Sequence, residues 1–287
     1  MEPLAYIGVP IDSVNRRDGG CERSPAVLRE LGLPAALGGA DGGDLEVRIR
    51  GEERDPATGV LAGPDVLSAT ATIRGAVAEL LGDGARPFLA GGCCAALPGA
   101  LAGARDALGT IGLVHFDGHA DLYDGETSAT GEAADMPVSV ALGLGPAGWV
   151  EVAGGASVVP ARTALVGFRD QAESVGYGMR QPETLDPPPL LFPAAELRAR
   201  SFNVVGRDLP NLVGAPFWLH FDVDVLDERV FPATDYLMPG GLGWGEAKEV
   251  LDPLLASSHL IGASVGCYNP GKDTGLNCGR GLVAAFA

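Results

Sequence analysis

Two short apolar runs, each followed at once by aspartates, most constrain what this chain can fold into. The first run is residues 113–116, directly before Asp117, and the second is residues 217–221, directly before Asp222. Apolar runs of this length, bounded by polar turns, are typical of buried strands in a parallel sheet. Ligands of open α/β sheets bind beyond the carboxyl ends of the strands. The sequence therefore predicts that both acidic groups meet at one edge of such a sheet.

The two acidic groups predict a metal site. The first group reads Asp117-Gly-His119-Ala-Asp121 and the second reads Asp222-Val-Asp224. Four carboxylates held close together repel one another strongly unless cations neutralise them. The alternative for the first group is a solvated loop, because short motifs match by chance. A second acidic group in the same strand-end position favours the metal site.

The rest of the chain alternates between strand-like and helix-like segments. Further strands are expected at residues 4–9, 87–90, 163–168 and 260–267, with one short strand among the loops of residues 32–63. Helices are expected at residues 24–31, 64–81, 96–108, 193–200 and 245–257, after Pro137 as far as Leu144, and at the C-terminus. This alternation predicts a doubly wound parallel sheet, with residues 1–287 forming a single domain.

Composition narrows the class of protein and its partners. The net charge of −17 argues against a nucleic-acid partner, which needs a basic face, and favours a cationic ligand. The sequence contains no apolar stretch long enough to span a membrane, and its start does not read as a signal peptide. The 5 cysteines follow no regular spacing, which predicts reduced thiols and a cytoplasmic location without a membrane partner.

Seven short motifs, in their order along the chain, resemble those of the ureohydrolase (arginase/agmatinase) family. They are Gly91-Gly92, residues 117–121, Met136-Pro137, residues 167–170, residues 220–234, residues 238–242 and residues 268–270. The resemblance implies a three-layer α/β/α sandwich around an eight-stranded, mainly parallel sheet. It also implies that water bridging two Mn²⁺ ions attacks a guanidino carbon, and that the chain forms trimers or hexamers.

The resemblance also implies which residues hold the metals. The six candidate ligands are Cys94, Asp117, His119, Asp121, Asp222 and Asp224. Asp117 and Asp222 would bridge both metals, His119 and Asp224 would complete one site, and Asp121 and Cys94 would complete the other. Carboxylates with one imidazole suit Mn²⁺.

Cysteine replaces the family's usual histidine at position 94. A thiolate ligand there would favour Zn²⁺ or Fe over Mn²⁺. The alternative is a buried, inert thiol. The adjacent Cys93 is expected to support the site or to pack.

Other positions depart from the family pattern where the substrate reacts. Ala134 stands where the family has a histidine that shuttles protons, so Asp135 or Glu132 is the candidate proton carrier. Cys267 stands where arginases have a glutamate that holds the guanidinium. His115 and His220 precede the acidic groups and are predicted to be satisfied core histidines.

These departures favour a hydrolase whose substrate is a guanidino compound other than free arginine. An N-hydroxyguanidino compound or another biosynthetic intermediate fits, because relatives that act on N-hydroxyarginine look similar in carrying cysteine at the first metal site. The products would be an amine and a urea-type compound. Two alternatives stay open: a catalytically impaired homologue that serves as a binding or oligomeric scaffold, and a deacylase with one metal.

Overall fold

One sheet of parallel strands organises the protein. The computed structural model describes residues 3–13, 20–214 and 216–287, and within these ranges eight strands form a sheet of order β2-β1-β3-β8-β7-β4-β5-β6. Every neighbouring pair of strands is parallel. The strands are β1 (Leu4–Val9), β2 (Gly38–Asp44), β3 (Arg86–Gly91), β4 (Gly112–Phe116), β5 (Thr163–Val166), β6 (Leu190–Phe192), β7 (Phe217–Asp222) and β8 (Leu260–Gly266).

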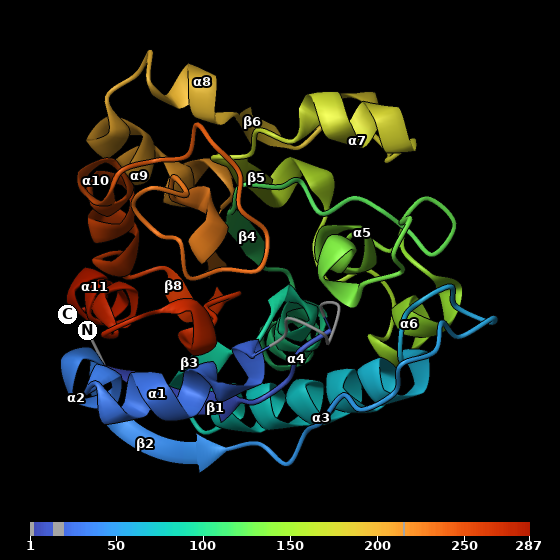
Figure 1. Cartoon of the computed structure of the whole chain (residues 1–287), viewed down its shortest axis with the longest axis horizontal. Helices are drawn as coiled ribbons and strands as arrows, with labels where there is room; N and C mark the ends of the chain where they lie inside the picture. Colours follow the sequence, from blue (N-terminus) through green and yellow to red (C-terminus); the bar gives the residue numbers. More distant parts are fainter. Residues whose placement is uncertain (1–2, 14–19, 215) are drawn as a thin grey trace.

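Helices cover both faces of this sheet, so the predicted three-layer α/β/α sandwich is confirmed. In Figure 1, α9, α10 and α11 lie to the left of β4 and α5 and α6 to its right. One face packs on α3 (Gly63–Gly82), α4 (Leu97–Leu108), α5 (Pro137–Ala141) and α6 (Ala147–Val152). The other packs on α1 (Ser24–Glu30), α2 (Leu33–Leu37), α9 (Phe202–Leu212), α10 (Trp244–Leu255) and α11 (Asn277–Ala285).

The central strands are buried on both faces, which explains their continuous apolar sequences. Successive residues of a strand point to opposite faces. In β4, Leu113 packs against the α3–α6 side and Val114 against the other side. In β7, Trp218 and Leu219 divide in the same way. Because β3, β8, β7 and β4 are adjacent and parallel, their carboxyl ends lie at one edge of the sheet.

Several short elements were not expected from the sequence. They are α2, α6, β6, α9 and α7 (Gln171–Tyr177). The helix expected at residues 193–200 is shorter, α8 (Ala194–Leu197). In α9, Pro210 lies within the helix. The sequence therefore did not predict this helix, because proline normally ends a helical pattern. The amphipathic spacing is nevertheless present, since Val205 and Leu209 are both buried.

The short strand expected within residues 32–63 is the edge strand β2, which pairs only with β1 among the described strands. Its sequence of glycine, alanine and aspartate contains no β-branched residue, and glycine is needed for close approach. A Cβ on Gly39 would lie 2.1 Å from the carbonyl oxygen of Leu4. Across the described ranges, every helix is too short or too polar to pass through a lipid bilayer.

Candidate metal centre

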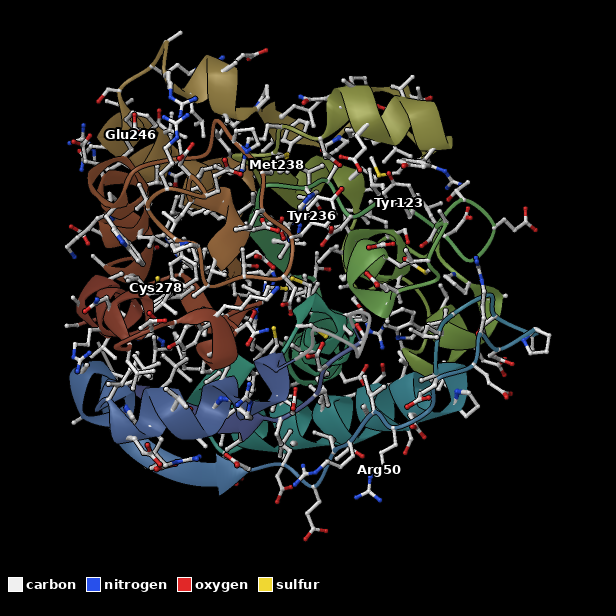
Figure 2. All side chains as sticks on the ribbon, in the orientation of Figure 1. Arg50, Tyr123, Tyr236, Met238, Glu246 and Cys278 are labelled. Atoms are coloured by element: carbon white, nitrogen blue, oxygen red, sulfur yellow. The ribbon has the colours of Figure 1, made fainter. Side chains whose placement is uncertain are left out.

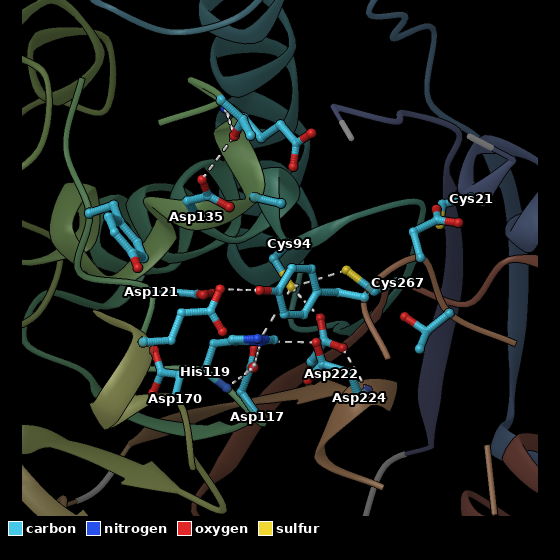
Figure 3. A pocket seen from close by; sticks show the side chains of 18 of the residues that line it. Cys21, Cys94, Asp117, His119, Asp121, Asp135, Asp170, Asp222, Asp224 and Cys267 are labelled. Carbon is cyan, nitrogen blue, oxygen red and sulfur yellow. Dashed lines mark hydrogen bonds and ion pairs between the residues drawn. The ribbon is translucent and has the colours of Figure 1, made fainter. Parts of the chain in front are cut away.

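The carboxyl ends of the four central strands surround one cavity of about 280 Å³ (Figure 3). Its floor comes from Cys94 after β3, Asp117 after β4, Asp222 at the end of β7 and Cys267 after β8. All predicted metal ligands and both candidate proton carriers line it: Cys94, Asp117, His119, Asp121, Glu132, Asp135, Asp222 and Asp224. Segments more than a hundred residues apart in the sequence therefore share one site.

Backbone N–H groups fix the orientation of the carboxylates. Asp117 Oδ1 accepts a hydrogen bond from the His119 amide at 2.7 Å, and Asp222 Oδ1 accepts one from the Asp224 amide at 2.9 Å. Asp224 Oδ1 accepts one from the Gly118 amide at 3.0 Å, which joins the two acidic loops. Each loop thus anchors one oxygen of its carboxylate.

Glycine is required where the chain passes closest to neighbouring backbone before Cys94. A Cβ on Gly92 would lie 1.4 Å from the carbonyl oxygen of Ile11. The next residue, Cys93, contacts Ser13 Oγ at 3.1 Å and does not line the cavity. Cys94 then begins a short 3-10 turn that leads into α4. Its thiol points to the cavity, 3.6 Å from the Sγ of Cys267.

Three groups of side chains that could bind metal overlap at Asp117, and a fourth, of Asp12, Cys21 and Asp235, lies apart from it. In each of the three groups that share Asp117 the ligand atoms lie within 4.8 Å of one another: Asp117 with His119 and Asp224, Asp117 with Asp121 and His115, and Asp117 with Cys94, Asp222 and His220. The expected pairing of His119 with Asp224 is present. Asp121 and Cys94, expected to share a site, fall in different groups that have Asp117 in common.

Burial and mutual repulsion make the charged carboxylates costly without cations. Burial, with the charges of Asp121 and Asp224, raises the pKa of Asp117 to about 7. Burial also raises the pKa of Asp121 and of Asp222 well above the usual value. Burial alone would lower the pKa of His119, but Asp224, 3.0 Å away, and Asp117 raise it well above the usual value. Bound cations, or protons, would therefore stabilise the centre by offsetting the repulsion between its carboxylates.

Two buried histidines, His115 and His220, lie beneath the carboxylates and add nitrogen atoms to the possible metal ligands. Asp121 Oδ2 and both ring nitrogens of His115 are buried without a well-aligned hydrogen bond among the described residues. His115 Nε2 nevertheless lies 3.2 Å from Asp117 Oδ2 and 3.4 Å from Asp121 Oδ2. Buried polar groups normally have partners or bind metal. The prediction that His115 is a satisfied core histidine therefore stays a prediction. His220 does have partners, Ser264 and Cys94. Together the oxygen, nitrogen and sulfur atoms form a donor set that fits divalent cations.

The predicted proton carriers lie on a second wall of the cavity. Asp135 accepts hydrogen bonds from Ser128 Oγ at 2.6 Å and Thr130 Oγ1 at 3.3 Å. Burial raises the pKa of Asp135, although both hydroxyls oppose the shift. Glu132 and Ala134 line the same wall. A carboxyl with a raised pKa thus lies near the position where the family resemblance placed a histidine.

Three tyrosines that sequence reasoning did not single out line the cavity: Tyr123, Tyr177 and Tyr236. Tyr123 and Tyr236 are labelled in Figure 2. The Tyr236 side chain is 47% exposed, its hydroxyl donates to Glu173, and its ring stacks edge-on with His119 at 4.9 Å. Tyr123 precedes the loop that holds Asp124 and Asp135, and it is partly buried. The aromatic residues give the cavity entrance an apolar wall.

Comparisons with known proteins agree with this geometry. The family model described as "Arginase family" matches residues 2–285. The arginase of Bacillus caldovelox is 25% identical over 286 residues, covering 95% of this chain and 93% of the relative. An N(omega)-hydroxy-L-arginine amidinohydrolase of Streptomyces lavendulae is 30% identical over 162 residues, covering 56% of this chain and 53% of the relative. The crystal structure of arginase from Bacillus cereus superposes with a TM-score of 0.84 at 20% identity, covering 99% and 96% of the two chains.

Proposed function

The chain belongs to the arginase family, and from this premise we propose that it is a metal-dependent amidinohydrolase. It would cleave a C–N bond of a guanidino compound and release an amine and a urea-type product. The observation that carries the proposal is the sharing of Asp117 among three candidate ligand groups. A carboxylate shared in this way suits two cations held side by side.

We propose that two divalent cations bind, with Cys94, Asp117, His119, Asp121, Asp222 and Asp224 as ligands. The group of Asp117, His119 and Asp224 is mainly oxygen and suits Mn²⁺. When bound, a pair of cations lowers the pKa of water and polarises the substrate. The amide hydrogen bonds to Asp117, Asp222 and Asp224 would hold the carboxylates in place during binding.

The charge of the cavity supports a cationic substrate. Among its described lining residues, His119 is the only basic side chain, whereas the carboxylates line several walls. The volume of about 280 Å³ suits a small guanidino compound. Cys267 lies where arginases have a glutamate, so a guanidinium would find no carboxylate there. An N-hydroxyguanidino group is less basic and depends less on such a partner, which supports a modified guanidine over free arginine.

Asp135 is the group we assign to proton transfer. Its raised pKa lets the carboxyl hold a proton nearer to neutral pH than an ordinary aspartate does. The hydroxyl of Ser128 donates to Asp135 Oδ2 and orients the carboxyl towards the cavity that it lines. The leaving amine needs a proton when the C–N bond breaks, and this carboxyl would supply it. Glu132 is the second candidate on the same wall.

The scaffold alternative is not favoured. A binding scaffold has no use for several buried carboxylates whose mutual repulsion destabilises the metal-free chain.

For the assembly, we propose one domain over residues 1–287 and a trimer or hexamer. Light scattering of the metal-loaded protein measures the mass of the assembly and so tests the trimer or hexamer. The mass of a single chain would contradict the proposed oligomer.

Urea release from metal-loaded protein across a panel of guanidino compounds tests the proposed activity. The panel should include arginine, N-hydroxyarginine and decarboxylated guanidino amines, with metal content measured on the same sample. Asp117→Asn should abolish turnover because Asp117 belongs to every group at the centre. Asp252→Asn is the matched control, since Asp252 is an exposed partner of Lys248 on α10. Two metals per chain without urea from any compound would contradict the proposal.

A further inference from the structure

Two histidines lie side by side directly beneath the acidic loops. His115 in β4 and His220 in β7 are paired in register on adjacent strands. Their rings are nearly parallel, with centroids 5.3 Å apart and an angle of 11° between planes. Both side chains are almost completely buried, and neither has a role in the proposed reaction so far. Such a pair requires a physical explanation, because imidazoles are polar groups.

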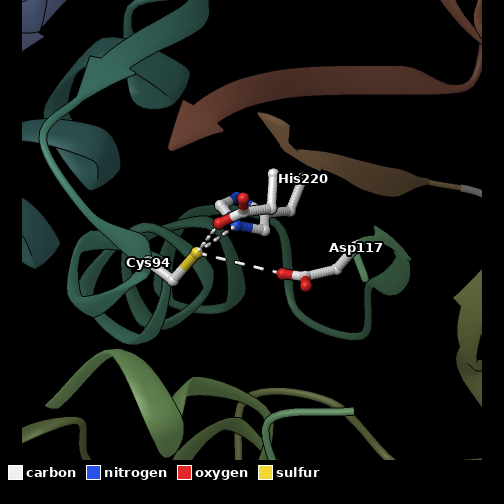
Figure 4. A group of neighbouring side chains, drawn as sticks. Cys94, Asp117 and His220 are labelled. Atoms are coloured by element: carbon white, nitrogen blue, oxygen red, sulfur yellow. Dashed lines mark hydrogen bonds between the residues drawn. The ribbon is translucent and has the colours of Figure 1, made fainter. Parts of the chain in front are cut away.

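His220 reaches into the centre beside Cys94. Its Nε2 lies 3.1 Å from Cys94 Sγ, and Figure 4 shows both side chains directed at one point together with Asp117. With Asp222, these side chains form a fully buried group whose ligand atoms lie within 4.8 Å of one another. Zinc bonds of about 2.0–2.3 Å place tetrahedral ligand atoms roughly 3.3–3.8 Å apart. Within the group, Cys94 Sγ lies 2.5 Å from Asp222 Oδ2, 3.1 Å from His220 Nε2 and 3.9 Å from Asp117 Oδ2. These spacings lie on both sides of the tetrahedral range, so side-chain shifts that separate Cys94 from Asp222 would let the group enclose a cation.

The other side of the His220 ring has the support that a metal ligand requires. Its Nδ1 lies 2.8 Å from Ser264 Oγ, and Trp218 Nε1 donates to the same oxygen at 3.0 Å. An imidazole that binds metal through one nitrogen normally donates from the other to such a partner, which fixes its tautomer. His115 has no corresponding partner at Nδ1 among the described residues. This difference distinguishes His220 as the ligand and His115 as its neighbour.

We propose that His220 is a direct ligand of the first metal, in a site formed with Cys94, Asp117 and Asp222. A thiolate, an imidazole and two carboxylates form a ligand set that favours Zn²⁺ over Mn²⁺. The neighbouring site, with His119 and carboxylates, keeps its preference for Mn²⁺. The centre is thus mixed, with zinc on the sulfur side. This inference rests on the proposed metal-dependent function and specifies its first site.

The wild-type protein provides the first test, without any variant. Metal-free full-length chain is given one equivalent each of Zn²⁺ and Mn²⁺, dialysed and analysed for both elements. X-ray absorption at the zinc edge then counts its ligands. We expect one zinc per chain with one sulfur and one imidazole. Zinc without an imidazole ligand, or two manganese ions and no zinc, would overturn the proposal.

Matched asparagine variants test His220 itself. In His220→Asn the amide can keep the contact to Ser264, but the Nε2 position is lost. His115→Asn is the control, because it changes the paired ring at the same depth. Loss of a supporting residue costs about 10–100-fold in metal affinity, so loss of a ligand should exceed that range. We expect His220→Asn to weaken zinc binding at least 100-fold and His115→Asn to weaken it less; a smaller loss in His220→Asn would overturn the assignment.

Cobalt spectra and urea release separate the failure of this inference from the failure of the proposed function. Co²⁺ in the first site should show a thiolate-to-cobalt charge-transfer band in wild type, and Cys94→Ser should abolish it. Wild type with two manganese ions, no such band and active urea release would overturn the His220 site and leave the amidinohydrolase intact. Zinc held by sulfur and imidazole, without urea from any guanidino compound, would sustain the site and overturn the activity.

Discussion

Replacing Asp222 by asparagine should have opposite effects on the metal-free and the metal-loaded protein. Without metal, Asp222 and Asp117 repel each other in a buried site, so Asp222→Asn should raise the melting temperature. With metal, the lost ligand should lower it. Asparagine is a conservative change, because its oxygen can still accept the hydrogen bond from the Asp224 amide, 2.9 Å away in wild type.

The size of the effect follows from the spacing of the carboxylates. Two unit charges 4.8 Å apart, the widest spacing within the group, repel by about 3.5 kcal/mol at an effective dielectric constant of about 20. Unfolding a chain of 287 residues carries an entropy of about 0.6 kcal/mol/K, so relief of this repulsion raises the melting temperature by about 6 °C. Losing one metal bound at a hundred times its Kd costs about 2.7 kcal/mol, or about 4–5 °C.

The sign of the pH dependence follows from the raised pKa values. The folded protein keeps carboxyl protons that the unfolded chain releases near its ordinary pKa of about 3.9. The metal-free wild type therefore loses stability as the pH rises from about 4 to about 7, the pKa of Asp117. Because burial also raises the pKa of Asp222, the benefit of Asp222→Asn should be larger at pH 8 than near pH 4.

Thermal unfolding in chelator and after metal reloading, at pH 8 and pH 5, measures both effects. Asp273→Asn is the matched control. Burial would raise the pKa of Asp273, but hydrogen bonds from the Gly279 amide and the Tyr268 hydroxyl hold it below the usual value. The control should therefore lower the melting temperature equally with and without metal. A metal-free Asp222→Asn protein that melts below wild type at pH 8 would refute the electrostatic reasoning.

Four further substitutions test individual parts of the centre. Cys94→His should increase Mn²⁺ affinity, measured by titration calorimetry, and an unchanged affinity would place the thiol outside the ligand set. Asp135→Asn should lower kcat by about 10²–10⁴-fold at unchanged metal content. Glu132→Gln should leave kcat near wild type, and the reverse ranking would make Glu132 the proton carrier. Gly92→Ala should destabilise the fold by about 1–3 kcal/mol or more and reduce bound metal, because its Cβ would overlap the Ile11 carbonyl; a stable variant with full metal content would contradict this.

The sheet could be predicted because its central strands carry signals that do not depend on neighbours. Buried strands such as β4 and β7 are apolar apart from His115 and His220, and the aspartates at their carboxyl ends mark where they end. The edge strand β2 and helix α9 could be placed poorly or not at all, since glycines and Pro210 obscure their patterns. Those elements depend on tertiary contacts that the local sequence does not reveal.

The sequence predicted which residues line the cavity better than it predicted how they group as metal ligands. Strand-end position was sufficient to expect Asp117 and Asp222 in one cleft. The separation of Asp121 from Cys94 depends on which rotamers and loops face each other, and no spacing along the sequence encodes that. The same holds for Tyr236, whose position beside His119 results from a loop that follows β7 at a distance of several residues.

The sequence did, however, contain a signal for the buried histidine pair. His-Phe-Asp occurs at residues 115–117 and again at residues 220–222. Because side chains two residues apart share a face of a strand, each histidine must lie beneath its aspartate, and parallel neighbours in register bring the two histidines together. The general tendency of buried histidines to be satisfied core groups is weaker than this geometric constraint. The centre therefore extends one residue layer into the sheet, and the ligand chemistry of His220 follows from the same strand period that positions Asp222.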